Sequence, residues 1–433
     1  MNAFLIAGGR VIDPSRTTDG IADVLVVDGR IEAVGRNVPC PDGARRIDAT
    51  GKVVAPGLID VHVHFREPGQ EHMETIQTGA TAAVAGGFTA VCAMPNTDPV
   101  IDNQAAVGFV VRQAIRAGKA RVYPIGCISL GQKGQQLAEF GEMVGAGAVA
   151  VSDDGRSVVS SQLMRTALEY AKVFGIPVAD HCEDPTLSLG GVMHEGLVAT
   201  KLGLKGIPSA AEEIIVARDI VLSELTGGHI HLCHISTRGS VELIRRAKQM
   251  GLRVTAEATP HHFSLTHELC LGYNTSAKMN PPLREPEDVE AIRQGLKDGT
   301  IDCIATDHAP HHYDAKQREF DDAPHGIIGL ETALGVGIRD LVETGHLSLP
   351  DLVARMSTVP ARVFRLSGGT LAVGAPADVT IFDPARRWVV RAGDLHSKSA
   401  NSPYLGQTLM GQADLTAVGG RIVFERGVQN PDA

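Results

Sequence analysis

Two histidines, His62 and His64, lie two positions apart within the apolar run 57–65. Side chains of a β-strand alternate between its two faces, so both imidazoles point to one side, with Asp60 behind them on the same face. Two imidazoles side by side at a strand end supply half of the ligands of a metal site. Alone, this pattern also fits a strand that carries two histidines by chance, so its meaning depends on the rest of the chain.

Further ligand candidates lie at the expected ends of other strands. They are Asn96, Asp153, Asp154, His181, His234 and Asp307. Nitrogen and carboxylate oxygen together suit Zn²⁺, with Mn²⁺ or Co²⁺ as substitutes. An acidic residue shared between two ions would allow a binuclear site. The joint placement of these residues favours one metal site over several unrelated structural roles.

The chemistry expected of such a site is hydrolysis. A bound metal lowers the pKa of water to near neutrality and polarises the carbonyl under attack. The carboxylate of Asp307 would accept the proton of the water and deliver it to the leaving nitrogen. This is cleavage of an amide-like bond without a covalent intermediate. Taken singly, His181 would more often be a core residue and Asp307 a helix N-cap.

The elements that must position these residues alternate along the chain. From about residue 56, apolar strand-like runs are followed by amphipathic stretches such as 103–117, 161–174, 210–225 and 240–250. Eight strands are expected, at 58–64, 89–93, 121–128, 148–154, 177–182, 229–234, 253–258 and 301–307. Eight strand–helix units predict an α/β fold, a (β/α)₈ TIM-like barrel, whose strand ends form the active-site face. An open doubly wound sheet is the alternative.

The residue pattern at the two ends of the chain differs from that of the middle. Short β-runs with turn signals fill residues 1–55, and similar runs return after about residue 366. The segments 9–13 and 420–424 look like strand partners. We therefore expect one small β-sandwich formed by 1–55 and 366–433, with the barrel at 56–365 inserted between them.

The composition fits a large globular protein. The chain has 433 residues, of which 43% are hydrophobic and 21% charged. Its net charge of −10 and lack of a basic run make nucleic acid a poor candidate partner. No apolar run approaches the roughly 18 residues of a membrane span, and no signal peptide is expected. The seven scattered cysteines indicate buried thiols rather than disulfides, which favours the cytoplasm, and Cys182 and Cys233 should point away from the histidines beside them.

Two long motifs carry a family resemblance. They are Asp60-Val-His-Val-His-Phe-Arg-Glu-Pro-Gly69 and Ala305-Thr-Asp-His-Ala-Pro-His-His-Tyr-Asp-Ala-Lys316. Shorter matches lie at 94–97, 152–155, 179–184, 234–237 and 259–262. With these motifs the chain resembles the amidohydrolase superfamily, and within it the class I dihydroorotases, over essentially its whole length. The resemblance implies reversible ring closure of N-carbamoyl-L-aspartate to L-dihydroorotate in pyrimidine synthesis.

The resemblance also implies roles for individual residues. His62 and His64 would bind a first metal together with Asp307, which would also act as general acid and base. His181 and His234 would hold a second ion if one is present, and Asp154, chosen over Asp153 by its spacing to His181, would bridge. One or two Zn²⁺ ions per subunit are therefore expected.

A carboxylate-bearing substrate accounts for a second set of implied roles. The guanidinium of Arg66 matches a carboxylate bidentately. Asn96, Asn280 and His311 would add hydrogen bonds to the substrate. Backbone groups at His325 and Gly326 would touch the ring, although relatives often carry an aromatic residue in place of His325. The remaining histidines near the motifs, read as structural or ambiguous, are His261, His262, His308 and His312.

Two rival functions follow from the same resemblance. Another cyclic amidohydrolase, such as a hydantoinase, dihydropyrimidinase or allantoinase, would place a carboxylated lysine where this chain has Ser152-Asp-Asp-Gly155. A non-catalytic scaffold subunit of aspartate transcarbamoylase would have lost metal ligands, whereas every ligand position is filled here. The sequence leaves association with the transcarbamoylase open. The fold favours a homodimer, and the polar segment 310–326 is expected to act as a lid over the site.

Overall fold

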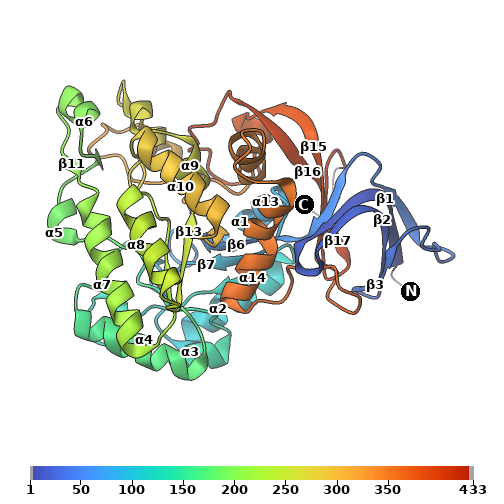
Figure 1. Ribbon diagram of the computed structural model, residues 1–433, viewed down its shortest axis with the longest axis horizontal. Helices are drawn as coiled ribbons and strands as arrows, with labels where there is room; N and C mark the ends of the chain where they lie inside the picture. The colour runs from blue at the N-terminus through green and yellow to red at the C-terminus, as the bar shows by residue number, and fades with distance from the viewer. Residues whose placement is uncertain (1–2, 429–433) are drawn as a thin grey trace.

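The N- and C-terminal parts of the chain share one sheet in the computed structural model, which describes residues 3–428 (Figure 1). The strand order is β17-β16-β15-β5-β1-β2-β3, with β4 paired to β1. The strands are β1 Ala3–Asp13, β2 Thr18–Val27, β3 Arg30–Gly35, β4 Arg45–Asp48, β5 Val53–Pro56, β15 Val379–Val389, β16 Thr408–Val418 and β17 Arg421–Glu425. The two ends of the chain therefore meet, through the antiparallel pair β5–β15.

The predicted pairing of 9–13 with 420–424 is wrong. Strand β17 pairs with β16, and three strands separate it from β1. A tight turn at Gly419 and Gly420 joins β16 to β17, and such a local hairpin closes a much shorter loop than a pairing across the whole chain would. The turn at Gly29 instead contacts the turn at Gly419, where an added side-chain carbon on Gly29 would lie 2.9 Å from the Gly419 carbonyl oxygen.

Parallel strands fill the middle of the chain. They form a three-stranded sheet, β6-β7-β8, and a four-stranded sheet, β14-β13-β12-β9. Their bounds are β6 Leu58–Val63, β7 Phe88–Ala93, β8 Arg121–Pro124, β9 Val178–Asp180, β12 Ile230–Leu232, β13 Val254–Ala258 and β14 Cys303–Ile304. The strand expected at 148–154 is reduced to parallel bridges from Val151 to Gly126 and Val178. A further parallel bridge joins Val63 to His308.

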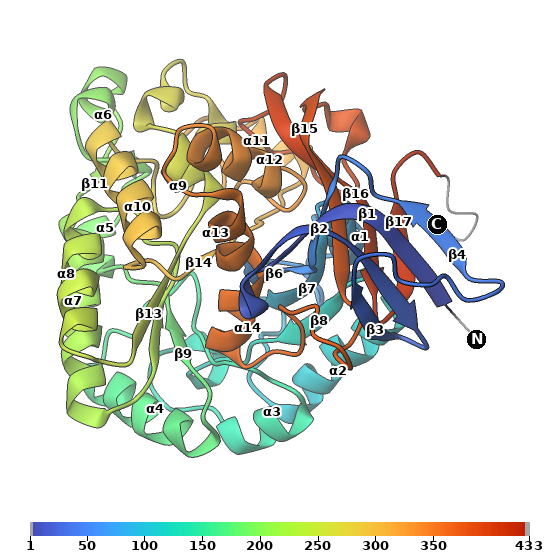
Figure 2. The same ribbon diagram turned by 45° about the vertical axis from the view of Figure 1, so that its right-hand side comes forward.

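Helices cover the outside of these strands, as Figure 2 shows for α3, α4, α7 and α8. The α-helices are α1 Ile76–Ala85, α2 Gln104–Ala117, α3 Phe140–Ala146, α4 Ser161–Phe174, α5 Pro185–Ser188, α6 Leu197–Leu202, α7 Ala210–Thr226, α8 Arg238–Gln249, α9 Pro260–Ser264, α10 Pro286–Asp298, α11 Tyr313–Lys316, α12 Ala333–Gly337, α13 Leu349–Val353 and α14 Val359–Phe364. The four helices predicted from amphipathic spacing are confirmed as α2, α4, α7 and α8.

Smaller elements complete the chain. They are the short strands β10 Met193–His194 and β11 Gly206–Ile207, the π-helical turns Ile338–Val342 and Ala354–Thr358, and the 3₁₀ turns Pro14–Arg16, Leu130–Gln132, His267–Cys270, Thr275–Ala277 and Ala392–Asp394. The paired strands β10 and β11 were not predicted, because two-residue strands leave no periodic signal. The division into 1–55, 56–365 and 366–433 stays a prediction.

Local sequence explains where the helices next to the site begin. Thr237, three residues after His234, accepts a hydrogen bond from the backbone N–H of Ser240 and so caps α8. Thr259 caps α9 in the same way, through the N–H of His262. Helix α8 then buries Val241, Ile244 and Ala247. Caps of this kind fix the points at which the chain leaves a strand end and turns into a helix.

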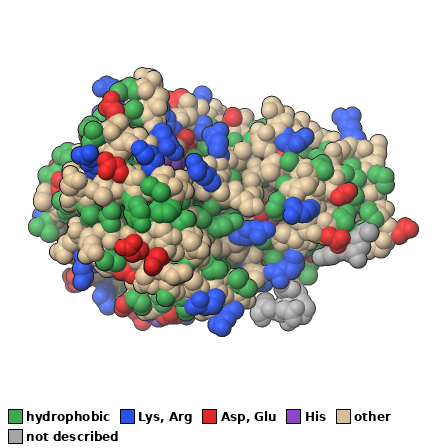
Figure 3. Space-filling view, turned by 90° about the horizontal axis from the view of Figure 1, so that it is seen from below, with side chains coloured by type: hydrophobic (Ala, Val, Ile, Leu, Met, Phe, Trp, Pro, Cys, Tyr) green, Lys and Arg blue, Asp and Glu red, His purple; other side chains and the backbone are tan. Residues whose placement is uncertain are grey.

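The surface gives two further observations. The face in Figure 3 carries basic and acidic side chains interspersed with apolar and polar ones, without a continuous field of Lys and Arg. Among residues 3–428, no helix is long and apolar enough to cross a membrane.

The packing of α1 against Phe65 gives a test of the fold. A side-chain carbon on Gly79 would lie 2.4 Å from the Phe65 ring, whereas on Gly108 of α2 it would meet only the flexible end of Arg112 at 3.2 Å. We expect Gly79→Ala to destabilise the protein by about 1–3 kcal/mol through overpacking. Gly108→Ala should be neutral or stabilising by up to about 1 kcal/mol, because alanine is the better helix former. Thermal unfolding of both variants checks this, and equal melting temperatures would contradict it.

Candidate metal centre

The side chains predicted to bind metal converge at the ends of the parallel strands. His62 lies in β6 and His64 directly after it, while His181, His234 and Asp307 follow β9, β12 and β14. Asp154 follows the Val151 bridge. All six are buried, with exposed fractions of 5% or less. Strands that run in parallel end at one rim, which is why residues far apart in the sequence meet here.

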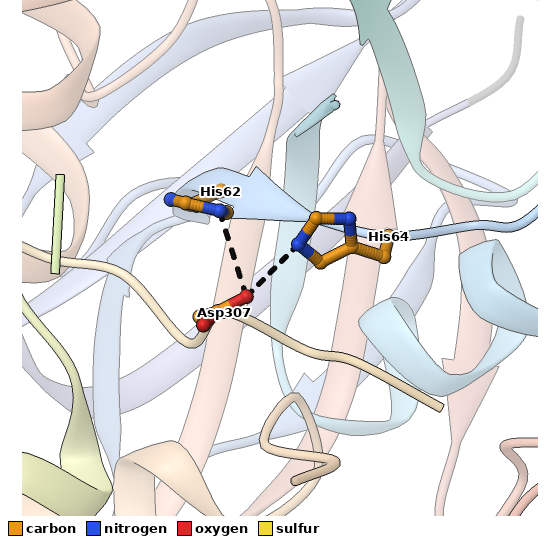
Figure 4. A group of neighbouring side chains, drawn as sticks. All are labelled: His62, His64 and Asp307. Atoms are coloured by element: carbon orange, nitrogen blue, oxygen red, sulfur yellow. Dashed lines mark hydrogen bonds and ion pairs between the residues drawn. The ribbon is translucent and has the colours of Figure 1, made fainter. Parts of the chain in front are cut away.

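One cluster joins His62, His64 and Asp307 (Figure 4). The Nε2 atom of His64 lies 3.0 Å from Asp307 Oδ1, and His62 Nε2 lies 3.5 Å from the same oxygen. Figure 4 shows both imidazoles turning these nitrogens toward the carboxylate. Two imidazole nitrogens and a carboxylate oxygen facing one point form a set of ligands typical of zinc.

Asp154 lies between this cluster and two more histidines. Its Oδ1 is 3.4 Å from His62 Nε2 and 3.6 Å from His234 Nε2, and its Oδ2 is 3.4 Å from His64 Nε2. His181 Nδ1 lies 3.9 Å from Asp154 Oδ1 and 2.9 Å from His234 Nε2. One carboxylate therefore faces all four imidazoles, which is the arrangement a bridging ligand requires.

The neighbouring acid, Asp153, turns the other way. Its carboxylate accepts hydrogen bonds from the backbone N–H groups of Ile128 and Ser129 and from the Ser129 hydroxyl. These bonds hold Asp153 against the 128–129 backbone, so only Asp154 faces the histidines. The structure places Asp154 there.

Unpaired buried atoms mark the centre of the cluster. His62 Nε2 and Asp154 Oδ1 are fully buried and lack a hydrogen-bond partner. Leaving such atoms unpaired costs about 1–3 kcal/mol each, and more for a charged group. These two atoms lie 3.4 Å apart, where the two groups of candidate ligands meet. A divalent cation bound there would pair with both atoms, so the residues present fit such an ion.

The backbone at two candidate ligands is strained. Asp307 has φ 47° and His234 has φ 35°, in the left-handed region that non-glycine residues rarely adopt. Arg66, two residues after His64, has φ 60°. Such conformations cost roughly 1–3 kcal/mol each and persist where the surrounding structure holds them, typically at functional sites.

Electrostatics in the cluster favour added positive charge. Burial alone lowers the pKa of His62, but the carboxylates of Glu257, Asp307 and Asp154 raise it well above its ordinary value. Burial raises the pKa of Asp307, but His62 and His64 outweigh it and bring it to about 2. The pKa of Asp154 is likewise held well below its usual range by the imidazoles. Protons and a metal cation therefore compete for this centre, so metal affinity should fall in acid.

The Nδ1 atoms of His62 and His64 also have hydrogen-bond partners. His64 Nδ1 lies 2.8 Å from Asn96 Oδ1, and the Asn96 amide donates to Asp154 Oδ2 at 3.3 Å. Asn96, predicted to bind substrate, is therefore also in contact with candidate metal ligands. His62 Nδ1 lies 2.6 Å from Glu257 Oε1. Glu257 was missed from the sequence, where the available signal was a lone acid inside the apolar strand 254–258.

Asp60 links the backbone of β6 to the backbone after β14. Its Oδ1 accepts hydrogen bonds from the backbone N–H groups of His62 and Thr306, both at 3.1 Å. Complete burial raises the pKa of Asp60 to about 7. These bonds tie β6 to the segment that leads into Asp307.

The two cysteines beside histidines remain thiols. Cys182 Sγ lies 3.6 Å from the Asp180 carbonyl oxygen, away from the histidines. Cys233, contrary to expectation, has its Sγ atom within 4.8 Å of ligand atoms of His62 and Glu257. Burial raises the pKa of the Cys233 thiol well above its ordinary value. A neutral thiol is a poor metal ligand, so the candidate ligands remain the imidazoles and carboxylates.

Arg66 and His311, two of the predicted substrate residues, lie against each other. The Arg66 Nε donates to the Pro310 carbonyl oxygen at 3.3 Å, and Nη2 lies 3.5 Å from His311 Nε2. His311 Nε2 is closer, at 2.7 Å, to the carbonyl oxygen of His325. Burial, and secondly Arg66, lower the pKa of His311 to about 2, so its imidazole is neutral.

Asn280 and Gly326 complete this set. The Asn280 amide lies 3.4 Å from His181 Nε2, and its buried Oδ1 has no partner. Gly326 has φ 153°, and a side-chain carbon there would lie 2.6 Å from the Ala309 carbonyl oxygen. Only glycine fits this approach. The structure thus places all of the predicted substrate residues around one region.

Three of the other histidines have partners outside the cluster. His308 Nε2 faces Glu74 at 3.4 Å, and His262 Nε2 contacts the Pro281 carbonyl oxygen at 3.0 Å. His312 is exposed and caps α11 through the N–H of Asp314. These contacts are consistent with the structural interpretation of His262, and they give structural partners to His308 and His312, which the sequence left ambiguous.

The segment 310–326 is tied down by a buried lysine. Lys316 Nζ donates to the carbonyl oxygens of Thr275, Lys278 and Pro324, at 3.1, 3.3 and 2.8 Å. Its ammonium thus joins this segment to the 275–278 turn. The role of 310–326 as a lid stays a prediction.

Known proteins resemble the chain over nearly its full length. A model of the dihydro-orotase-like family matches residues 51–240. The chain is 54% identical to a dihydroorotase of Pelobacter propionicus, over 98% of this chain and 100% of that protein. It is 55% identical to a dihydroorotase of Citrifermentans bemidjiense, over 98% of this chain and 99% of the relative.

Solved structures give a second comparison. An L-hydantoinase (dihydropyrimidinase) from Arthrobacter aurescens superimposes with a TM-score of 0.87 at 26% identity, covering 98% of this chain and 96% of that one. The fold is therefore an α/β fold shared with cyclic-amide hydrolases, and the sequence likeness to dihydroorotases is about twice as high. The chain belongs to the dihydroorotase family.

Proposed function

We propose that this chain is a dihydroorotase, which interconverts N-carbamoyl-L-aspartate and L-dihydroorotate plus water in pyrimidine biosynthesis. The observation that carries the proposal is identity of 54–55% to dihydroorotases over 98% of the chain. The convergence of four imidazoles and two carboxylates supports it, because a metal held there would activate water and polarise the ring amide carbonyl.

The fold proposed for this activity is a closed (β/α)₈ barrel. Supporting it, the parallel bridges at Val151 connect the segment just after β8 to β9, and the bridge from Val63 to His308 connects β6 to the segment after β14. These contacts lie where an eight-stranded ring would close. Closure would bring all strand ends to one rim, where the candidate ligands lie.

The metal proposed for the centre is Zn²⁺, with one or two ions per subunit and Mn²⁺ or Co²⁺ as substitutes. His62, His64 and Asp307 would hold the first ion and His181 and His234 the second, with Asp154 between them. When bound, such an ion acidifies a water molecule and polarises the ring amide carbonyl.

Asp307 is the proposed proton carrier. At neutral pH its carboxylate is ionised, since its pKa is about 2 beside His62 and His64. In ring opening it would take a proton from the attacking water as the water oxygen bonds to the carbonyl carbon. As the carbon–nitrogen bond breaks, the same proton would pass to the leaving nitrogen, and ring closure reverses these transfers.

Arg66 is the proposed partner of the substrate carboxylate. It is buried, burial lowers its pKa to about 10, and it remains charged at neutral pH. A buried guanidinium with its Nη groups turned toward His311 suits a planar anionic group. Asn96, Asn280, His311 and the backbone at His325 and Gly326 would complete recognition of the ring.

The hydantoinase-like alternative has a specific observation in its favour, the structural likeness to an L-hydantoinase. Against it stands Asp154, an aspartate where the resemblance predicts a carboxylated lysine in those enzymes. Rings such as hydantoin and dihydrouracil also carry no carboxylate to pair with Arg66. The scaffold alternative is disfavoured because all six candidate ligands converge.

Assembly and location stay predictions within this proposal. The fold favours a homodimer, association with aspartate transcarbamoylase stays open, and the scattered cysteines favour the cytoplasm. Sedimentation of the purified chain, alone and mixed with the transcarbamoylase, measures the first two directly.

Asp307→Asn tests the proton carrier. We expect kcat for ring opening of dihydroorotate to fall by about 100-fold or more, because an amide cannot accept the proton. Asp302→Asn is the matched control, since Asp302 pairs with Lys248 and contacts no candidate ligand. Metal content is measured on both, and unchanged kcat in a metal-loaded Asp307→Asn enzyme would rule out this role.

Arg66→Lys tests carboxylate recognition. Loss of the guanidinium fork should raise KM for dihydroorotate by about tenfold to a hundredfold, with a smaller change in kcat, because the contact holds substrate and transition state alike. The exposed Arg112→Lys on α2 serves as the control. Steady-state kinetics check the split, and an unchanged KM would remove Arg66 from the substrate site.

A further inference from the structure

A second buried carboxylate lies directly behind the candidate metal centre. Glu257, in β13, is fully buried. Its Oε1 lies 2.6 Å from His62 Nδ1, and its Oε2 lies 3.0 Å from His231 Nε2. His231 Nδ1 in turn lies 2.9 Å from the Thr255 hydroxyl. Both oxygens of Glu257 are therefore used by histidines.

Glu257 also reaches a second candidate ligand through the backbone. Its Oε1 accepts a hydrogen bond from the N–H of His234 at 3.3 Å. His234 is one of the strained residues, with φ 35°. One carboxylate thus contacts the imidazole of His62, on the first cluster, and the peptide of His234, on the second.

These contacts fix which nitrogen of His62 is free. An ionised carboxylate only accepts hydrogen bonds, so His62 Nδ1 must carry the proton. The nitrogen left to bind a metal, once its proton is displaced, is His62 Nε2, the buried atom without a hydrogen-bond partner that faces Asp154 and Asp307. His64 is held by a neutral amide instead, that of Asn96.

A packing role alone does not explain why position 257 is a buried glutamate. Among the described residues, the hydrogen bonds and ion pairs of the Glu257 carboxylate come from His62, His231 and His234, and none comes from a lysine or arginine. Burying a carboxylate costs several kcal/mol unless it is paired, and an apolar side chain would fill the same volume without that cost. A carboxylate behind a ligating imidazole, by contrast, orients it and makes it a stronger ligand.

We propose that Glu257 is a positioning residue that sets the metal affinity of the centre by holding His62 in its ligating tautomer and the His234 backbone in place. This rests on the metal site of the proposed function. It adds to that function a residue outside the proposed set of metal ligands.

Metal affinity of two variants tests the proposal. Zn²⁺ or Co²⁺ is titrated into metal-free protein against a chromophoric chelator, so the readout does not depend on activity. Glu257→Gln keeps an acceptor for the His62 N–H but loses the charge, whereas Glu257→Leu loses both. We expect the dissociation constant to rise in that order, within about 10-fold to 100-fold. The absorption spectrum of the Co²⁺-loaded Gln variant should also shift, reporting a changed ligand field.

Asp378→Asn is the matched control. Asp378 is a buried carboxylate that pairs with Arg121 and the N–H of Gly419, remote from the histidines. We expect the Asp378→Asn variant to bind metal with the dissociation constant of the wild type. Wild-type affinity and an unaltered cobalt spectrum in Glu257→Gln would overturn the proposal, as would an equal loss in Asp378→Asn. If Glu257→Leu does not fold, the dissociation constants and cobalt spectra of Glu257→Gln and Asp378→Asn still test the proposal.

Failure of the proposed function gives a different result. A wild-type protein that binds zinc but leaves dihydroorotate unchanged would contradict the activity. The order of metal affinities among the variants would still test Glu257.

Discussion

The carboxylate of Asp154 is the contact on which the arrangement of the site depends. It lies within 3.9 Å of nitrogens from four imidazoles, which come from three separate strand ends. Four imidazoles in a buried space would repel one another if they were protonated, and two carboxylates would do the same if left unpaired. Their mutual attraction lowers the pKa of Asp154 and Asp307 and leaves a centre suited to a cation.

Hydrogen bonds and helix caps elsewhere in the structure hold these side chains in position. Asp60 ties β6 to the segment before Asp307, and Glu257 ties His62 to the start of the loop after β12. Helix caps at Thr237 and Thr259 fix where the chain turns away from the strand ends. The strained backbone at Asp307 and His234 shows that this support is strong enough to hold costly conformations.

Much of the site could be predicted from the sequence because strand alternation is a local rule. It placed His62 and His64 on one face, the expected strand ends supplied the other ligand candidates, and the family resemblance assigned their roles. Glu257 was missed because a single acid in a strand carries no sign of what faces it until the neighbouring strand is in place. The pairing of 9–13 with 420–424 was wrong because strand order depends on chain closure, which residue patterns do not record. The strand at 148–154 was reduced to a bridge, although Asp154 kept its position.

The most direct measurement of the central claim is ring opening by metal-free protein titrated with Zn²⁺, assayed in parallel on dihydroorotate, hydantoin, dihydrouracil and allantoin. The site described here predicts turnover of dihydroorotate alone, restored by one or two equivalents of zinc. Turnover of the uncharged rings instead would contradict the assignment of Arg66 and Asp154. Absence of turnover on all four substrates despite bound zinc would contradict the catalytic function and favour a scaffold.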